Sequence, residues 1–241
     1  MKPRCIVADN PGPFTLDGTR TYLVGHRRVA VIDPGPDVES HVRAVVNAVA
    51  EAEDVRVLLT HGHADHVGAA EAVAGAVGAQ ILGVGIPAAR ALGDRETVET
   101  DQGRLVSIDT PGHSREHVAF HWLEADAGFP GDLVLGRGET TWVGEYEGCV
   151  ADYLDSLERL RALRCSVLYP AHGPPVQDPD RTLNAFEAHR RERVRQVQEA
   201  LAARPEATTD ELVAKVYGTT IPEGLEAAAE RSVEALRDFL V

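Results

Sequence analysis

The segment 60–66, THGHADH, constrains this chain more than any other feature, because it places four metal-binding side chains directly after a short apolar run. His61 and His63 are two residues apart, so an extended backbone points both imidazoles the same way. Asp65 and His66 follow where a helix is expected to begin, which aims a carboxylate and a third imidazole toward the same space. Imidazole and carboxylate together suit Zn²⁺ and related first-row ions. We therefore interpret the segment as part of a metal site rather than as a solvated polar loop.

Three further segments carry one candidate ligand each, and each lies at or just after a predicted strand. They hold His113 within TPGHS, Asp132 within GD and His172 within YPAHG. Each signal is weak by itself, since a lone histidine is more often an ordinary surface or core residue, but loops from several strands can converge on one site. With the first cluster, the total is five histidines and two aspartates. That number exceeds the ligands of one tetrahedral zinc and suits two metal ions.

Strand-like and helix-like patterns alternate over the first three quarters of the chain, which predicts a layered α/β architecture. The predicted strands are Thr21–Val24, Val29–Ile32, Val55–Leu59, Gln80–Leu82, Arg104–Ile108, His117–Leu123, Asp132–Leu135 and Ser166–Tyr169, and the predicted helices are Val38–Val49, Glu71–Val77 and Val150–Leu163. The 241 residues allow one full domain and a smaller piece.

The character of the chain changes after the proline-rich loop that follows His172. Three helices are predicted there, Arg181–Ala203, Thr209–Tyr217 and Glu223–Leu240, with no strand between them. We therefore predict a catalytic domain over residues 1–180 and an all-helical subdomain over 181–241.

The net charge of −14 argues against a broadly basic surface that would coat nucleic acid. One dense basic patch remains, Arg190–Arg195, and on a helix Arg191 and Arg195 share a face that could steer an RNA backbone. We favour the interpretation that this stretch is a solvated helix face, on which the arginines pair with the glutamates Glu187, Glu192 and Glu199.

No apolar run approaches the roughly 18 residues that a membrane span needs. The first residues also lack the apolar stretch of a secretory signal. The three cysteines, Cys5, Cys149 and Cys165, are widely spaced and form no CxxC pair, which excludes a disulfide scaffold and favours a reducing compartment. We therefore expect a soluble, cytoplasmic protein with no membrane contact and no stable protein partner, and a homodimer stays open.

The order of these motifs, HxHxDH, then PGH, then GD and a final histidine, resembles the metallo-β-lactamase superfamily over residues 10–180. The resemblance implies an αβ/βα sandwich with a dinuclear zinc site at one edge. It implies that His61, His63 and His113 hold the first metal, that Asp65, His66 and His172 hold the second, and that Asp132 bridges both. Asp33, at the end of a predicted strand, matches the superfamily's first motif, where it would support the site without binding metal.

Within the superfamily, several segments are similar to the β-lactamase-like-protein-2 family. These are Asn10-Pro11-Gly12-Pro13, the run 15–19, Gly112-His113-Ser114 followed by His117, and Gly131-Asp132 followed by the run 135–138. The resemblance implies a small winged-helix-like tail and endoribonuclease activity on single-stranded RNA. The sequence departs from that family over Glu139–Tyr146 and in a tail without the strand pair of a wing.

Two zinc ions about 3.5–4 Å apart can share a water and lower its pKa toward about 7, which supplies hydroxide at neutral pH. In this hypothesis Asp65 and Asp132 are catalytic residues through the metals that they hold. His117, four residues after His113, would donate a hydrogen bond to a scissile phosphate or an oxyanion, and a structural His117 is a nearly equal alternative.

The leading hypothesis is therefore a dinuclear zinc-dependent hydrolase that cleaves a phosphodiester, with single-stranded RNA as substrate. The alternative is a glyoxalase II-like thioester hydrolase, or a lactonase, acting on a small molecule. A third interpretation is a nucleic-acid-binding protein with a structural metal, although structural zinc sites need only four ligands. The same ligands also accept iron or manganese.

Overall fold

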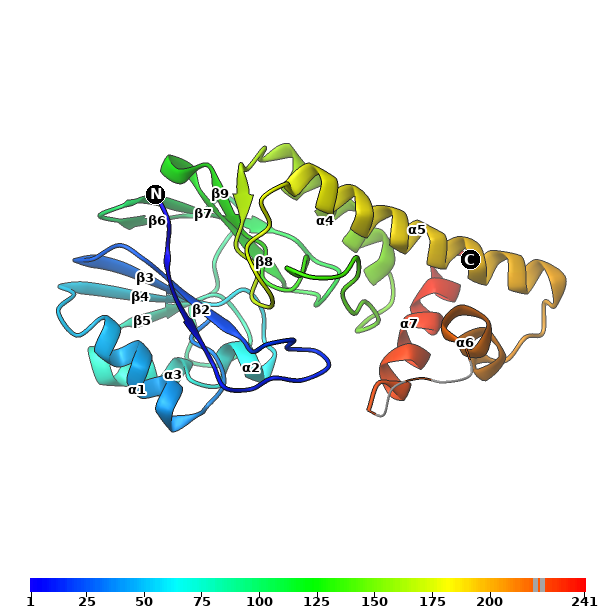
Figure 1. Cartoon of the computed structure of the whole chain (residues 1–241), viewed down its shortest axis with the longest axis horizontal. Coiled ribbons are helices and arrows are strands. Elements are labelled where there is room, and N and C mark those ends of the chain that lie inside the picture. Colours follow the sequence, from blue (N-terminus) through cyan, green and yellow to red (C-terminus); the bar gives the residue numbers. More distant parts are fainter. Residues whose placement is uncertain (219–220, 222–223) are drawn as a thin grey trace.

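Two five-stranded sheets face each other, with the strand orders β1-β2-β3-β4-β5 and β10-β9-β8-β7-β6. The computed structural model describes residues 1–218, 221 and 224–241. Helices cover the outer face of each sheet, which gives the four-layer αβ/βα sandwich that the sequence predicts (Figure 1). The strands are β1 (Arg4–Val7), β2 (Arg20–Val24), β3 (Arg28–Ile32), β4 (Asp54–Leu58), β5 (Gln80–Leu82), β6 (Thr97–Thr100), β7 (Gly103–Asp109), β8 (Val118–Trp122), β9 (Ala127–Phe129) and β10 (Val167–Leu168).

The helices follow the predicted pattern closely. They are α1 (Glu39–Ala48), α2 (Ala64–Val67), α3 (Ala70–Val77), α4 (Cys149–Ala162), α5 (Pro179–Ala203), α6 (Thr209–Tyr217) and α7 (Glu226–Asp238), with a short 3₁₀ turn at Leu123–Ala125. Local chemistry fixes several of the ends. The Asp178 side chain accepts a hydrogen bond from the Arg181 N–H at the start of α5, and Thr208 and Glu211 form a capping box at the start of α6.

The topology brings the ends of several strands to one edge of the sandwich. Strands β3, β4 and β5 are parallel, so Ile32 lies opposite Leu58 and both strands end at the same edge. The other sheet reaches this edge through the start of β8, where the Val118 N–H donates a 2.8 Å hydrogen bond to the Thr60 carbonyl. The loops that carry the predicted ligands all leave from this edge.

Three apolar clusters hold the layers together. Tyr22, Phe120 and Trp122 belong to the cluster between the two sheets. A second cluster joins the first sheet to α1 and α3. The third joins α4 to the whole tail, because Leu157 of α4 shares it with Phe186 of α5 and with residues of α6 and α7. The tail is therefore packed onto the sandwich through one continuous core, and the division at residue 180 stays a prediction.

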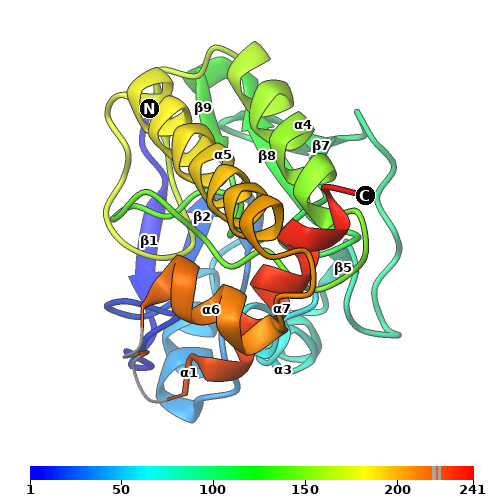
Figure 2. The ribbon, with the colours of Figure 1, turned by 90° about the vertical axis from the view of Figure 1, so that its right-hand side faces the viewer.

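The tail is seen from its end in Figure 2, where α6 and α7 lie beside the long helix α5. In the part of the tail that the structure describes there are helices and no strands, so no wing is present there. The predicted start of the last helix, at Glu223, lies outside the described residues, and α7 begins at Glu226.

One predicted strand is wrong. Residues 132–135 form buried turns, and the strand is β9, just before them. The chain turns at Gly131, whose φ is +51°, and the Leu133 N–H donates to the Pro130 carbonyl at 3.0 Å. An apolar run that is buried in a turn has the same composition as a strand, so its sequence pattern does not separate the two. Strands β1 and β6 were not predicted.

Cys149 and Cys165 are buried, Cys5 is exposed, and all three are free thiols. No helix in the described part of the chain combines the length and the apolarity that crossing a membrane requires.

Candidate metal centre

Three imidazoles meet where β4 ends and where the loop between β7 and β8 folds over it. The His61 Nε2 lies 3.0 Å from the His63 Nδ1, which in turn lies 3.1 Å from the Nε2 of His113. The ligand atoms of these three residues all lie within 4.8 Å of one another. Three nitrogen donors that converge this closely can coordinate one cation.

A second group lies next to the first. The short helix α2 presents Asp65 and His66, and the loop after β10 adds His172. The Asp65 Oδ2 lies 3.3 Å from the His66 Nε2 and 3.2 Å from the His172 Nε2. These atoms also lie within 4.8 Å of one another, so this group offers one oxygen and two nitrogens to a cation.

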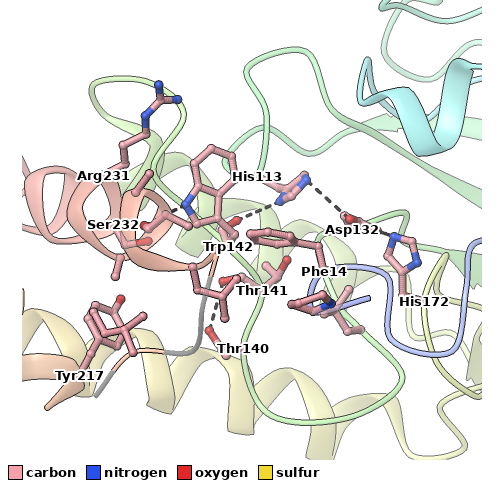
Figure 3. Close-up of a pocket in the computed structure, with 18 of the residues that line it drawn as sticks. Phe14, His113, Asp132, Thr140, Thr141, Trp142, His172, Tyr217, Arg231 and Ser232 are labelled. Atoms are coloured by element: carbon pink, nitrogen blue, oxygen red, sulfur yellow. Dashed lines mark hydrogen bonds and ion pairs between the residues drawn. The ribbon is translucent and has the colours of Figure 1, made fainter. Parts of the chain in front are cut away.

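Asp132 lies between the two groups and faces each with a different oxygen. Its Oδ1 lies 3.3 Å from the His172 Nε2 and 3.6 Å from the His66 Nε2. Its Oδ2 lies 3.7 Å from the Nε2 of His113. This is the arrangement expected of a carboxylate that bridges two cations (Figure 3 shows Asp132 between His113 and His172).

The buried polar atoms of the site fit metal ions. The His66 Nε2 and the Asp132 Oδ1 are buried and have no hydrogen-bond partner among the described residues, although such atoms are normally satisfied. Burial lowers the pKa of His113 to about 4 and, with neighbouring imidazoles, holds the pKa of His61 well below its ordinary value. Both rings are therefore neutral at physiological pH, which is the form that donates a lone pair to a metal.

The outer nitrogens of the imidazoles are held by the surrounding chain. The His66 Nδ1 lies 2.9 Å from the Asp33 Oδ2, and the His113 Nδ1 lies 2.9 Å from the Trp142 carbonyl. Asp33 also accepts hydrogen bonds of 2.8 Å from the N–H and the hydroxyl of Thr60. Contacts of this kind orient metal-binding imidazoles. Asp33 thus lies where the resemblance placed it, beside the site and in contact with a ligand.

Two supporting contacts have no counterpart in the sequence analysis. The buried Thr19 hydroxyl lies 3.2 Å from the Asp65 Oδ2, and the Asn10 side chain brackets Thr19 with two hydrogen bonds of 2.9 and 3.0 Å. The Glu145 Oε1 lies 3.5 Å from the His63 Nε2. Asn10 belongs to a segment that is similar to the β-lactamase-like-protein-2 family, and Glu145 belongs to the segment that departs from that family. The sequence positions of these residues do not predict their contacts with the site.

The contacts of His117 favour the structural one of the two roles that the sequence left open. Its Nδ1 lies 2.9 Å from the Thr110 hydroxyl, and its Nε2 accepts a 3.2 Å hydrogen bond from the Asp132 N–H. Burial holds its pKa well below the ordinary value, so the ring is neutral. Both ring nitrogens are engaged within the protein, which favours the structural alternative, a ring that positions the Asp132 backbone, over the donor role.

A cavity of about 730 Å³ extends from the two groups of ligands to α5, α6 and α7. Phe14 and Trp142 lie between the ligands His113 and Asp132 and the tail (Figure 3). The other lining residues are of two kinds. The apolar ones include Pro13, Leu135, Tyr217, Ile221, Leu225, Ala227, Ala228 and Ala229, and the polar ones are Thr140, Thr141, His189, Arg190, Arg193, Arg231 and Ser232.

Two of the four arginines in the basic stretch of α5 pair with the glutamates that the favoured interpretation names. Arg191 contacts Glu187 at 2.8 Å, and Arg195 contacts the other two predicted glutamates at 2.6 and 2.7 Å. Arg190 is buried instead of lying on this face.

Comparison with known proteins decides the family. The metallo-beta-lactamase superfamily profile matches residues 14–96 and 81–172. The chain belongs to this superfamily.

Its relatives extend over the tail as well. A beta-lactamase-like protein 2 homolog of Caenorhabditis elegans is 30% identical over 95% of this chain and 80% of its own length. An atrochrysone carboxyl ACP thioesterase of Aspergillus chevalieri is 32% identical over 93% of this chain and 75% of its own length. Among solved structures, a metallo-beta-lactamase family protein of Thermus thermophilus superposes with a TM-score of 0.79 at 23% identity, covering 99% of this chain and 92% of that one. The chain is thus a superfamily member with a His/Asp cluster capable of binding metal.

Proposed function

We propose that this protein is a metal-dependent hydrolase of carboxylic thioesters or esters whose acyl group is apolar. The observation that carries the proposal is the apolar cavity beside Asp132 and His172. Each buried methylene of an acyl chain gains about 0.8 kcal/mol from such a surface. Aromatic and aliphatic walls offer no comparable gain to the charged backbone of a nucleic acid.

The charge distribution favours the same substrate class over RNA. An RNA backbone is bound by cationic side chains that are available to its phosphates. Arg191 and Arg195 already contact glutamates, and the chain carries a net charge of −14. The two arginines of that stretch without a carboxylate partner in the described part of the chain, Arg190 and Arg193, lie in the cavity wall, where they can bind one anionic group rather than a run of phosphates. The leading hypothesis from the sequence, cleavage of single-stranded RNA, is therefore less well supported than its thioester alternative.

The similarity to a protein named as a thioesterase supports this choice, since the two chains are 32% identical over nearly the whole of this one. Hydrolysis of a thioester consumes one water molecule. The hydroxyl of the water adds to the carbonyl carbon, the carbon–sulfur bond breaks, and the thiol leaves with the remaining proton.

The donor set fits two first-row cations. We propose zinc, and nitrogen and oxygen donors also accept iron or manganese. The first would be held by His61, His63 and His113, the second by Asp65, His66 and His172, with Asp132 shared. When bound, such ions polarise a carbonyl oxygen and lower the pKa of water.

The chain's own residues orient and enclose this centre. Asp33 and the Trp142 carbonyl fix two of the imidazoles, and Thr19 fixes the Asp65 carboxylate. Phe14 and Trp142 lie on the cavity side of the ligands (Figure 3). An acyl chain bound between these rings and the tail would bring its carbonyl carbon to the ligand edge.

The test is a hydrolysis screen of metal-analysed protein against a hexanoyl thioester, S-lactoylglutathione, an acyl lactone and a short single-stranded RNA. We expect turnover of the hexanoyl thioester, lost in His63→Ala and kept in His26→Ala, which removes an exposed histidine distant in sequence from the ligands. RNA cleavage that depends on His63, without thioester turnover, would overturn the proposal.

A further inference from the structure

Two arginines of α5 line the cavity at the end formed by the tail, and both lack a carboxylate partner. Arg190 is only 3% exposed, and its guanidinium donates to the Thr141 carbonyl at 2.9 Å and lies 5.3 Å from the centre of the Tyr153 ring. Its Nε has no hydrogen-bond partner among the described residues. Arg193 donates to the Gln196 side chain at 2.9 Å and to the Val216 carbonyl.

Their neighbours Arg191 and Arg195 on the same helix, which do not line the cavity, have carboxylate partners. Each of these two contacts a glutamate within 2.8 Å. Within the described part of the chain, no carboxylate lies within 4.0 Å of Arg190 or Arg193, although the chain carries 38 acidic residues. The cationic pair of the cavity, Arg190 and Arg193, thus lines the cavity without a carboxylate partner among the described residues. The Arg193 guanidinium also lies 5.0 Å from the centre of the Tyr217 ring of α6, and its Nε lies 3.4 Å from the His189 Nε2.

A buried guanidinium without a counter-ion is costly, because desolvation is repaid only by a paired anion. In an otherwise apolar cavity, a bound molecule can supply that anion. Guanidinium groups favour carboxylate and phosphate, whose oxygens accept two parallel hydrogen bonds.

We propose that the cationic pair Arg190 and Arg193 binds an anionic group of the substrate, so that the substrate carries an anion at a distance from the scissile carbonyl. This proposal rests on the proposed hydrolase function, which identifies the scissile carbonyl. The anion is either a carboxylate on the acyl side or a phosphate on the thiol side.

The deciding measurement is direct binding to the metal-loaded protein, which does not depend on turnover. The probes are 1-octanesulfonate, whose sulfonate is a poor metal ligand, and the neutral 1-octanol. We expect the Arg193→Gln variant to bind octanesulfonate about tenfold more weakly than the wild type, the effect of losing one charge-assisted contact. The affinity for 1-octanol should be the same in the wild type and in Arg193→Gln.

Arg191→Gln is the matched control, because it removes the same charge from the same helix outside the cavity. Arg193 is used because it is only half-buried, whereas Arg190 is almost fully buried. Equal octanesulfonate affinity in the wild type and Arg193→Gln, or an equal loss in Arg191→Gln, would overturn the proposal. A failed hydrolysis screen would leave this binding result intact, so the two proposals fail separately.

Two kinetic arms then identify the source of the anion. The first compares hexanoyl and adipyl thioesters of N-acetylcysteamine, and the second compares hexanoyl thioesters of pantetheine and 4′-phosphopantetheine. A loss of kcat/KM in Arg193→Gln that is confined to the adipyl thioester assigns a carboxylate on the acyl side. A loss confined to the phosphopantetheine thioester assigns a phosphate on the thiol side. Equal loss for all four substrates would contradict an anion-specific role.

Discussion

The ligand edge of the sandwich and the cavity wall of the tail are built in opposite ways. Four of the seven candidate ligands come from residues 61–66, and all seven lie in short segments at the ends of strands. The cavity wall takes single residues from the loop at Phe14, the segment at Trp142 and the helices of the tail. The candidate metal ligands therefore lie in short segments of the sequence, whereas the cavity wall is formed by the packing of distant segments.

The two regions also differ in what holds them. The ligands are fixed by hydrogen bonds to buried polar groups such as Asp33 and Thr19. The tail is held by an apolar core that it shares with α4. Substitutions in the first region should therefore change metal binding and kcat, and substitutions in the second should change KM.

The largest effect is expected at Asp132. Replacing it with asparagine removes the charge that faces both groups of ligands, and we expect kcat to fall by about 10²–10³-fold, the scale of losing one stabilising group. Metal content should fall as well. The control is Asp155→Asn, an exposed aspartate of α4. Full activity in Asp132→Asn would contradict the bridging role.

The next effect tests His117 as a positioning residue. His117→Leu removes the acceptor for the Asp132 N–H, and we expect metal affinity to fall about 10–100-fold, as for other groups that orient ligands. His117→Gln, which can still accept that hydrogen bond, should recover part of the loss. If kcat falls at unchanged metal affinity, and glutamine recovers nothing, His117 acts on the substrate instead.

A smaller effect is expected in the cavity wall. Phe14 is 49% exposed and faces the cavity, so Phe14→Ala should raise KM for a hexanoyl thioester by about threefold to tenfold through lost apolar contact. Metal content and kcat should not change. Val7→Ala, at a similarly exposed apolar residue of β1, serves as the control. A fall in metal content in Phe14→Ala would mean that the two regions are not separable.

The smallest effect concerns pH, at a buried histidine that the Thr21 hydroxyl links to the Asp33 carbonyl. The His41 Nε2 is buried against the Thr21 hydroxyl at 2.9 Å, and burial lowers the pKa of His41 below its ordinary value. The native protein therefore binds fewer protons than the unfolded chain, and stability is lost as the pH falls through the ordinary histidine pKa of about 6.5. His41→Gln should flatten the dependence of the melting temperature on pH between about 7 and 5. An unchanged slope would exclude His41 as a contributor.

The ligands could be predicted from the sequence because each lies close to the end of a strand, and parallel strands end at the same edge. The superfamily resemblance then supplied their division into two groups. The support from Thr19 and Glu145 could not be predicted, since both reach the site from segments that carry no ligand. The sequence left two roles open for His117, because spacing from His113 says nothing about which way a buried ring turns.

The fold was predictable where periodicity was strong, as in α4, α5 and α6. It was not predictable for short strands such as β9, where the sequence Ala127–Phe129 lacks β-branched residues. The cavity could not be predicted at all. Its walls depend on where the tail packs, and no motif in the sequence encodes that position.

The most direct test of the account is a chain-length series of acyl thioesters, from acetyl to octanoyl, hydrolysed by the metal-loaded wild-type protein. The account predicts that kcat/KM rises about threefold to fourfold per methylene, the equivalent of about 0.8 kcal/mol, until the cavity is filled. A kcat/KM that does not change with chain length would contradict an acyl-binding cavity beside the metal centre.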